Sequence, residues 1–189
     1  MSVASEARAE IEADRLWRSE EIRLLHNQAS GLAEAKKGVF RRSLVVMVYA
    51  HLEGFCARAL EIYVAKINGL SLKVSDVDWG LATAALAQTF DKLHNKDLKC
   101  SIFKNDLPED AKLHRFARDR DFLESITCFE QEQVLVDSDL VVSTDSNLKP
   151  VVLRKMLFRL GLDHAMADPW SGQLHQLLGK RNNLSLIHI

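Results

Sequence analysis

The chain has 189 residues, of which 47% are hydrophobic and 27% are charged, a composition that excludes disordered, collagen-like and repeat proteins. Its formal charge of -1 excludes a global positive field that would hold nucleic acid or an anionic membrane nonspecifically. The chain has only 3 prolines and 8 glycines, and its apolar residues recur with the helical period, so we predict an all-α protein.

Two long helices are predicted in the first third of the chain. Apolar residues three to six positions apart predict an amphipathic helix from Ser5 to about Leu32. Gly38 is expected to break the chain. The segment from Val39 to about Asn68 is apolar on more than one face, so we expect a long central helix that ends at Asn68-Gly69.

The middle of the chain is predicted to hold two shorter helices and one ambiguous segment. Ser75-Asp76 is expected to cap a helix over 79–93, and a second helix is predicted from Leu107 to Ile126, with Pro108 near its first turn. The β-branched clusters of 133–142 are compatible with a pair of short strands or with a buried loop.

Two helices are predicted near the C-terminus. Capping side chains at 144–147 precede Pro150, and the helix that follows is expected to end at Gly161. A last helix is expected to open at Asp168-Pro169, with an apolar stripe formed by Leu174, Leu177 and Leu178.

Common catalytic signatures are absent from the sequence: it has no phosphate loop, GxSxG elbow, HExxH motif or EF-hand spacing. We therefore expect neither a cofactor nor a metal. Three scattered cysteines without a CxxC pair favour a reducing cytoplasm. No targeting peptide is evident, and no apolar stretch approaches the roughly 20 residues that span a bilayer, so no membrane partner is expected.

Polar residues in unusual places are the best candidates for a site. His51 and Glu53 interrupt the most apolar segment, and 180–183 reads Lys-Arg-Asn-Asn. Each has a structural alternative: an ion pair for Glu53, a hydrogen-bonded boundary position for His51, and favourable cations at a helix end for Lys180 and Arg181.

Three segments together resemble a known family. RRSLVVMVYAHLEGFCARALEIYV, STDSNLKPVVLRKMLFRLGLD and LLGKRNN, in this order, resemble the MAE-type branch of the HEPN superfamily. The resemblance covers about Arg41 to Asn183. It implies one helical domain over 1–183, a bundle of about five to six helices around a long central helix, with a possible short β-like excursion near 133–142.

The resemblance also implies a chemistry, because many HEPN domains are metal-independent endoribonucleases that act as dimers. Carried over to this chain, Arg181 would hold the scissile phosphate, Asn182 is the polar residue that follows it, and Glu53 would orient Arg181. A histidine would transfer a proton.

The position of that histidine departs from the family pattern. The usual spacing would put it at position 186, where this chain has Leu186, whereas a looser spacing fits His188. Residues 184–189, LSLIHI, resemble the translation of a transposon adapter used in preparing sequencing libraries. We therefore expect a non-native tail at 184–189 and a chain truncated at the motif.

The sequence thus predicts a cytoplasmic HEPN endoribonuclease of the toxin or antiphage-defence type, which acts on RNA as a homodimer, with an antitoxin protein as a further candidate partner. One alternative is a noncatalytic HEPN module that binds RNA or protein. Another is a helical bundle that serves only dimerisation.

Overall fold

A computed structural model of the chain describes residues 2–145 and 147–185. This part of the chain has eight α-helices and no strand, so the all-α prediction is confirmed and the count of five to six helices is too low. The helices are α1 (Val3–Ser30), α2 (Glu34–Gly69), α3 (Trp79–Ala85), α4 (Ala87–His94), α5 (Ala111–Ile126), α6 (Ser138–Val141), α7 (Pro150–Arg159) and α8 (Ser171–Ser185). Three 3-10 helices lie between them: η1 (Val74–Asp76), η2 (Phe129–Gln131) and η3 (His164–Trp170).

The chain divides into two compact units. Unit 1 comprises Met1–Lys66 and Ser138–Ile189, and unit 2 comprises Ile67–Asp137. Each is described by itself below. The expectation of one domain over 1–183 concerns how the chain folds, and it stays a prediction.

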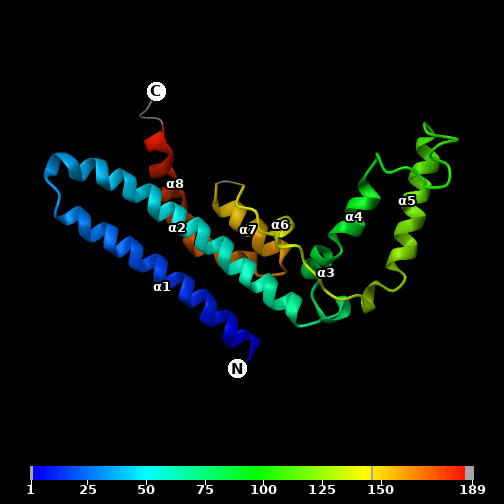
Figure 1. The fold of residues 1–189 in the computed structure, drawn as a ribbon, viewed down its shortest axis with the longest axis horizontal. Coiled ribbons are helices and arrows are strands. Elements are labelled where there is room, and N and C mark those ends of the chain that lie inside the picture. The colour runs from blue at the N-terminus through cyan, green and yellow to red at the C-terminus, as the bar shows by residue number, and fades with distance from the viewer. Residues whose placement is uncertain (1, 146, 186–189) are drawn as a thin grey trace. The chain divides into compact units, whose positions relative to one another are not determined.

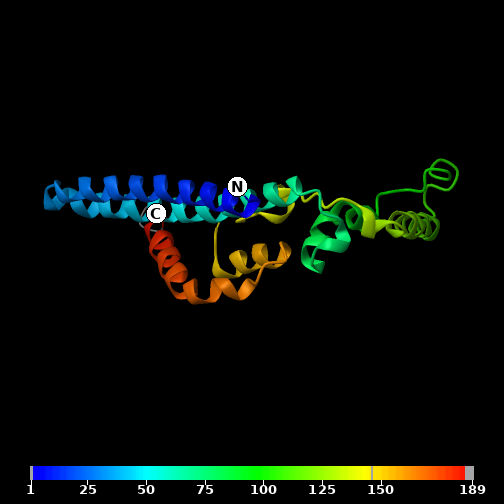
Figure 2. The same ribbon diagram turned by 90° about the horizontal axis from the view of Figure 1, so that it is seen from below.

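Unit 1 is built around α2. In Figures 1 and 2, α1 runs antiparallel along one side of α2, and α7 and α8 lie on its other side. The largest fully buried side chains of this unit come from α2, from α7 and from the residues that flank α7, and they are Ile62, Leu148, Met156 and Leu160. Burying such apolar side chains is the main contribution to the stability of this unit.

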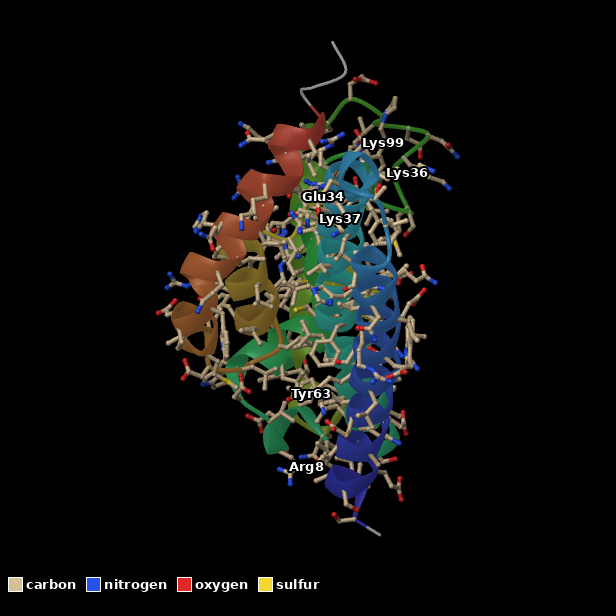
Figure 3. All side chains as sticks on the ribbon, turned by 90° about the vertical axis from the view of Figure 1, so that its left-hand side faces the viewer. Arg8, Glu34, Lys36, Lys37, Tyr63 and Lys99 are labelled. Carbon is tan, nitrogen blue, oxygen red and sulfur yellow. The ribbon has the colours of Figure 1, made fainter. Side chains whose placement is uncertain are left out.

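The long predicted helix is present but differs in its limits. α2 has 36 residues and begins at Glu34, where Glu34 and Lys37 form an ion pair of 2.7 Å (Figure 3). The break predicted at Gly38 is wrong, because the chain turns at 31–33 and Gly38 lies inside α2. A single glycine costs a helix only about 1 kcal/mol relative to alanine, so it need not end one.

α2 is also the one helix in the described ranges that is long and apolar enough to cross a membrane. Only 17% of its most apolar window is buried within this chain, and Val39 and Val46 are exposed on it. Core helices of soluble proteins meet the same criterion, so length and composition alone do not assign α2 to a membrane.

α7 begins and ends where the sequence predicts, but its N-terminus is not capped as predicted. Pro150 occupies its first turn, and Gly161, just beyond its end, has a φ of 67°, a conformation that glycine adopts without strain. The N-cap is Lys149, which makes no side-chain cap hydrogen bond. The predicted capping by side chains of 144–147 is therefore wrong, and Asn147 is available for contacts elsewhere.

Unit 2 is made of short helices whose caps differ from the predicted ones. The Asp78 side chain, rather than Ser75-Asp76, caps α3 by accepting hydrogen bonds from the backbone N–H groups of Gly80 and Leu81. The predicted helix over 79–93 is divided at Leu86 into α3 and α4. α5 begins at Ala111, capped by Asp110, instead of at Leu107, so Pro108 precedes this helix.

The ambiguous segment at 133–142 forms no strand pair. It begins with an isolated antiparallel bridge between Gln133 and Lys73, continues as extended backbone, and then forms the short helix α6. Of its six apolar side chains, Val134, Val136 and Val141 are buried, whereas Leu135 and Leu140 are exposed and Val142 is half-buried. The segment is therefore a partly buried loop followed by a short helix.

His114 fixes the long connection between α4 and α5. Its Nδ1 accepts a hydrogen bond from the Cys100 backbone N–H at 3.1 Å, so the neutral ring carries its proton on Nε2 and donates to the Pro108 carbonyl at 3.1 Å. This buried ring thus holds two points of the loop against α5.

Candidate functional site

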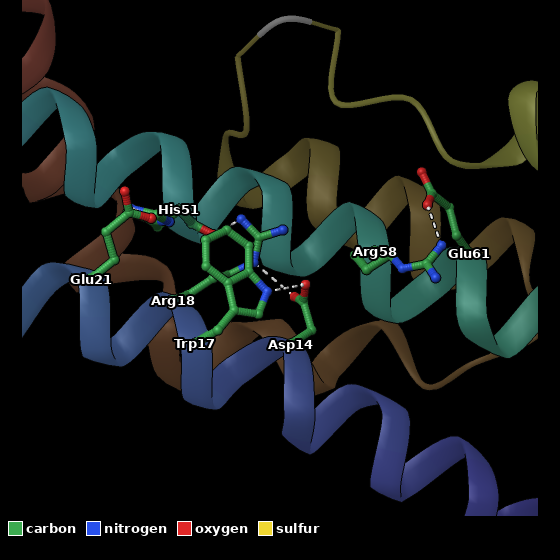
Figure 4. Close-up of polar contacts among 7 residues, drawn as sticks. All are labelled: Asp14, Trp17, Arg18, Glu21, His51, Arg58 and Glu61. Atoms are coloured by element: carbon green, nitrogen blue, oxygen red, sulfur yellow. Dashed lines mark hydrogen bonds and ion pairs between the residues drawn. The ribbon is translucent and has the colours of Figure 1, made fainter.

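A layer of polar side chains joins α1 to α2 (Figure 4). His51, buried on α2, places Nε2 3.4 Å from Oε2 of Glu21, and its ring meets Trp17 edge-on with centroids 5.6 Å apart. Both partners belong to α1. His51 therefore lies at the boundary between α1 and α2, as the alternative interpretation expects, but its buried Nε2 makes no hydrogen bond within the described residues.

The glycine of the YAHLEGF segment lies where an arginine of α1 crosses α2. Arg18 donates from Nε to Asp14 at 2.7 Å and from Nη1 to the His51 carbonyl oxygen at 3.4 Å. A Cβ atom on Gly54 would lie 2.7 Å from Nη1 of Arg18. A side chain at position 54 would therefore displace a guanidinium group that is already paired with Asp14 and largely buried.

Tyr49 is the centre of the candidate site. Its ring is 2% exposed, and its hydroxyl accepts a hydrogen bond from the Leu148 backbone N–H at 2.5 Å and donates to Oδ1 of Asn147 at 3.4 Å. The loop before α7 is thereby attached to α2. A further ion pair between Asp145 and Lys155 of α7 holds the same loop at 2.5 Å.

Arg181 of α8 reaches the same tyrosine. Its guanidinium carbon lies 4.7 Å from the centroid of the Tyr49 ring, a cation–π distance, and Nη1 donates to Oδ1 of Asn147 at 3.5 Å. Among the residues that the structure describes, no carboxylate lies within the 4.0 Å of an ion pair with Arg181. An aromatic face and an amide oxygen therefore position this cation without neutralising it.

Glu53 lies one turn after Tyr49 on α2 and does not pair directly with Arg181. Its Oε1 is buried and has no hydrogen-bond partner within the described part of the chain. Burial raises the pKa of Tyr49 above its ordinary value, the hydrogen bond from Leu148 opposes this, and the charge of Glu53 raises the pKa further, while that of Arg181 lowers it. Glu53 and Arg181 thus both act on one phenol.

The structure accordingly brings together two of the predicted site residues, Glu53 and Arg181, around Tyr49. Asn182 follows Arg181 on α8 and is exposed, and His188 lies outside the described residues. Sequence reasoning missed Tyr49 and Asn147 as site residues. The YAH and SNL letters of the family resemblance contain both, but no sequence pattern distinguished Tyr49 as a site residue, and Asn147 was expected to cap the helix that begins at Pro150.

Removing the Tyr49 hydroxyl tests how the site is supported. We expect Tyr49→Phe to lower the free energy of unfolding by about 1–3 kcal/mol, because the Leu148 N–H loses its acceptor in a buried place. Urea denaturation followed by circular dichroism measures the change. Thr83→Val removes a hydroxyl from an exposed helix position and should change stability by less than about 0.5 kcal/mol. Equal effects of the two substitutions would contradict the supporting role of the phenol.

Cys56, three residues after Glu53, gives a second test of the buried environment. Burial, and after it the charge of Glu53, raises the pKa of the Cys56 thiol to about 11. At pH 8 about one Cys56 in a thousand is then a thiolate, against about a quarter for an ordinary cysteine. We expect iodoacetamide to modify exposed Cys128 at least about 100-fold faster than Cys56 in the native protein, as followed by mass spectrometry. Modification rates that become equal only after unfolding would support this description of Cys56. Similar rates for the two cysteines in the native state would refute it.

Comparison with known proteins relates these features to one family. A family model described as RiboL-PSP-HEPN matches residues 13–185, which include most of α1, all of α2 and unit 2, the loop with Asn147, and Arg181 on α8. The comparisons with curated proteins and with solved structures found no match. Within the described residues, no group of three histidine, cysteine or acidic side chains is placed to hold a metal ion.

Proposed function

Since this chain belongs to the RiboL-PSP-HEPN family, we propose that its full-length form is a metal-independent endoribonuclease of the toxin or antiphage-defence type, acting in the cytoplasm. Membership of the HEPN superfamily, expected from the motifs, is confirmed, whereas the MAE-type branch stays a prediction. Domains of this superfamily commonly bind RNA and form dimers, so an RNase-like or RNA-binding function is the coarser statement that family membership itself supports.

One observation carries the catalytic proposal: Arg181 is held in place and yet keeps its charge. The Tyr49 ring and the Asn147 amide fix the guanidinium, and in the described part of the chain no carboxylate pairs with it. A guanidinium that is oriented but not neutralised is suited to bind a phosphodiester through its fork of donors. It would also offset the negative charge that develops on the phosphate in the transition state.

Glu53 supports this proposal in a second way. Its unpaired Oε1 is a buried acceptor beside the phenol that Arg181 covers. A small movement of Arg181, or the hydroxyl of a bound ribose, would satisfy this oxygen, and leaving it unpaired is costly. We propose that Glu53 positions the arginine when RNA is bound, and that a histidine beyond Asn183 in the natural sequence transfers the proton.

A homodimer is part of the proposal, and the exposed apolar residues of the α1–α2 pair support it. Seven large ones are more than a third exposed in the single chain: Val3, Leu16, Trp17 and Leu24 on α1, and Val39, Val46 and Met47 on α2. Apolar surface of this kind is typical of association with another protein surface. A second copy would cover it, and an antitoxin protein would be a further partner.

A noncatalytic RNA-binding module is the second candidate, and one observation favours it. Within the described residues, the histidine nearest in sequence to the site, His51, faces Glu21 of α1 instead of Arg181. His51 is then not placed to transfer a proton beside Arg181.

Cleavage without metal separates the two functions. The test incubates the protein, carrying its natural C-terminus, with a labelled RNA in EDTA and follows the products by gel electrophoresis. The proposal expects EDTA-resistant cleavage. RNA binding without turnover would overturn the nuclease and favour the noncatalytic module.

A further inference from the structure

Unit 2 has a pocket of its own between α4 and α5. Its volume is about 260 Å³, and its walls include Thr89 and Lys92 from α4 together with Arg118, Asp121, Phe122 and Ser125 from α5. Nothing in the cleavage site described above uses these residues. Acidic residues interrupt the basic ones around Arg118, so the sequence by itself favours a solvated helix face there over a contact with RNA.

Two cations of this pocket lack a carboxylate partner. Lys92 is exposed and makes no ion pair or hydrogen bond within the described ranges. Arg118 donates from Nη1 to the Leu98 carbonyl oxygen at 2.9 Å, but its Nε is buried and has no partner there. Asp121, the one acidic residue among the six named above, is 3.2 Å from Arg120 in an ion pair. The pocket therefore has an excess of positive charge and an unsatisfied donor.

An aromatic ring completes the pocket. Phe122 is half-buried, and its centroid lies 5.9 Å from that of Phe90 on α4, so a neighbouring ring supports its orientation. The hydroxyls of Thr89 and Ser125 supply neutral donors and acceptors nearby. Proteins that bind single-stranded nucleic acids commonly combine an aromatic face with nearby cations, so that a base stacks on the ring and the phosphates contact the cations.

We propose that the α4–α5 pocket binds one nucleotide of single-stranded RNA, with the base against Phe122 and a phosphate between Lys92 and Arg118. The choice of RNA rests on the proposed function, but the binding does not depend on cleavage. An acidic peptide would pair with the two cations but would not require the aromatic ring or the hydroxyl groups. A nucleotide would contact all of these groups, so we favour it as the ligand.

Binding of a short RNA tests the proposal. The probe is a fluorescein-labelled decamer of uridylate, titrated in EDTA against the full chain carrying Arg181→Ala, so that cleavage does not interfere. We expect Arg118→Gln, Lys92→Gln and Phe122→Leu each to weaken binding about tenfold, as removal of a stacking or charged contact does. Each lysine or arginine substitution should also reduce the slope of log affinity against log salt by about 0.7.

Arg115→Gln is the matched control, because Arg115 lies on the same helix, carries the same charge and is absent from the pocket wall. Equal weakening by Arg115→Gln and Arg118→Gln overturns the pocket. The proposal is also overturned if the decamer binds and none of the pocket substitutions changes its affinity. The pocket would then be a site for a protein ligand. Lys92→Gln keeps the test valid if Arg118→Gln fails to fold, since Lys92 makes no contact that holds the loop.

A second probe, uridine 5′-monophosphate, distinguishes a free nucleotide from a strand. Binding of the monophosphate as tightly as the decamer would overturn the assignment to RNA, whereas much tighter binding of the decamer supports it. Cleavage by the chain with Arg181 intact is measured separately. If the chain cleaves RNA but the pocket substitutions leave decamer binding unchanged, only the proposed pocket is refuted. If these substitutions weaken binding but the chain never cleaves RNA, only the proposed nuclease activity is refuted.

Discussion

Replacing Arg181 by alanine is expected to slow RNA cleavage in EDTA by about 100- to 1000-fold, the usual cost of losing one positioned donor to transition-state charge. The guanidinium stacks on Tyr49 and bonds to Asn147 without a carboxylate partner in the described residues, so its charge is available to the phosphate. Cleavage rates of the protein with its natural C-terminus, measured on a labelled RNA, provide the readout.

Lys180→Ala is the matched control for this substitution. Lys180 is the neighbouring cation, it is exposed, and no contact fixes it within the described chain. We expect Lys180→Ala to change cleavage by less than about threefold, the small effect of a surface charge. Arg181→Lys should keep most of the folding stability but not the rate, because lysine lacks the planar fork.

Unfolding must be distinguished from lost chemistry in this experiment. Circular dichroism and urea denaturation of Arg181→Ala should resemble those of the parent chain before the rate is interpreted. Unchanged EDTA-resistant cleavage by a folded Arg181→Ala protein would remove Arg181 from the mechanism.

Truncating Met156 is expected to give the largest loss of stability. Its side chain is fully buried on α7, and so are Leu148 and Leu160, which flank this helix in the sequence. We expect Met156→Ala to lower the free energy of unfolding by about 2–5 kcal/mol, through lost burial and the cavity that remains. Urea denaturation monitored at 222 nm measures this loss.

Val151→Ala provides the comparison on the same helix. Val151 is 67% exposed, so its truncation removes little buried surface and should change stability by less than about 0.5 kcal/mol. Similar losses for the two variants would show that the face of α7 described as buried is not the core of unit 1. Met156→Ala should also weaken the site indirectly, since α7 follows the loop that carries Asn147.

Local patterns predicted the helices well where sequence and backbone requirements coincide. Pro150 and Gly161 mark α7 because proline suits a first helical turn and glycine suits a positive φ, so both limits could be read from the sequence. Gly38 misled the prediction because a glycine permits a break without requiring one. The chain turns instead at 31–33, where Gly31 is the C-cap of α1 with a φ of -83°, a conformation that any residue can adopt.

The site was predictable only in part. The family resemblance identified Glu53 and Arg181, and the structure places both around Tyr49, but their roles stay predictions. A direct ion pair between them was the simplest expectation for a carboxylate in an apolar helix, yet the phenol lies at the centre of the arrangement. Periodicity could not show this, because contacts 99 residues apart depend on how α2, α7 and α8 pack.

The same logic applies to Asn147. A polar residue just before a helix is usually a cap, and only the three-dimensional structure reveals that α7 begins without one. Its Oδ1 instead accepts hydrogen bonds from both Tyr49 and Arg181.

The order in which these parts emerge from the ribosome has a consequence for the cell. The contact of Arg18 with α2 joins residues 33 apart, whereas the Tyr49–Leu148 contact joins residues 99 apart, and Arg181 is translated later than either. Contacts between nearby residues form before distant ones. A nascent chain can therefore pair α1 with α2 well before it has a guanidinium to place on Tyr49, so the proposed nuclease would stay harmless to the messenger RNA that encodes it until translation has passed α8.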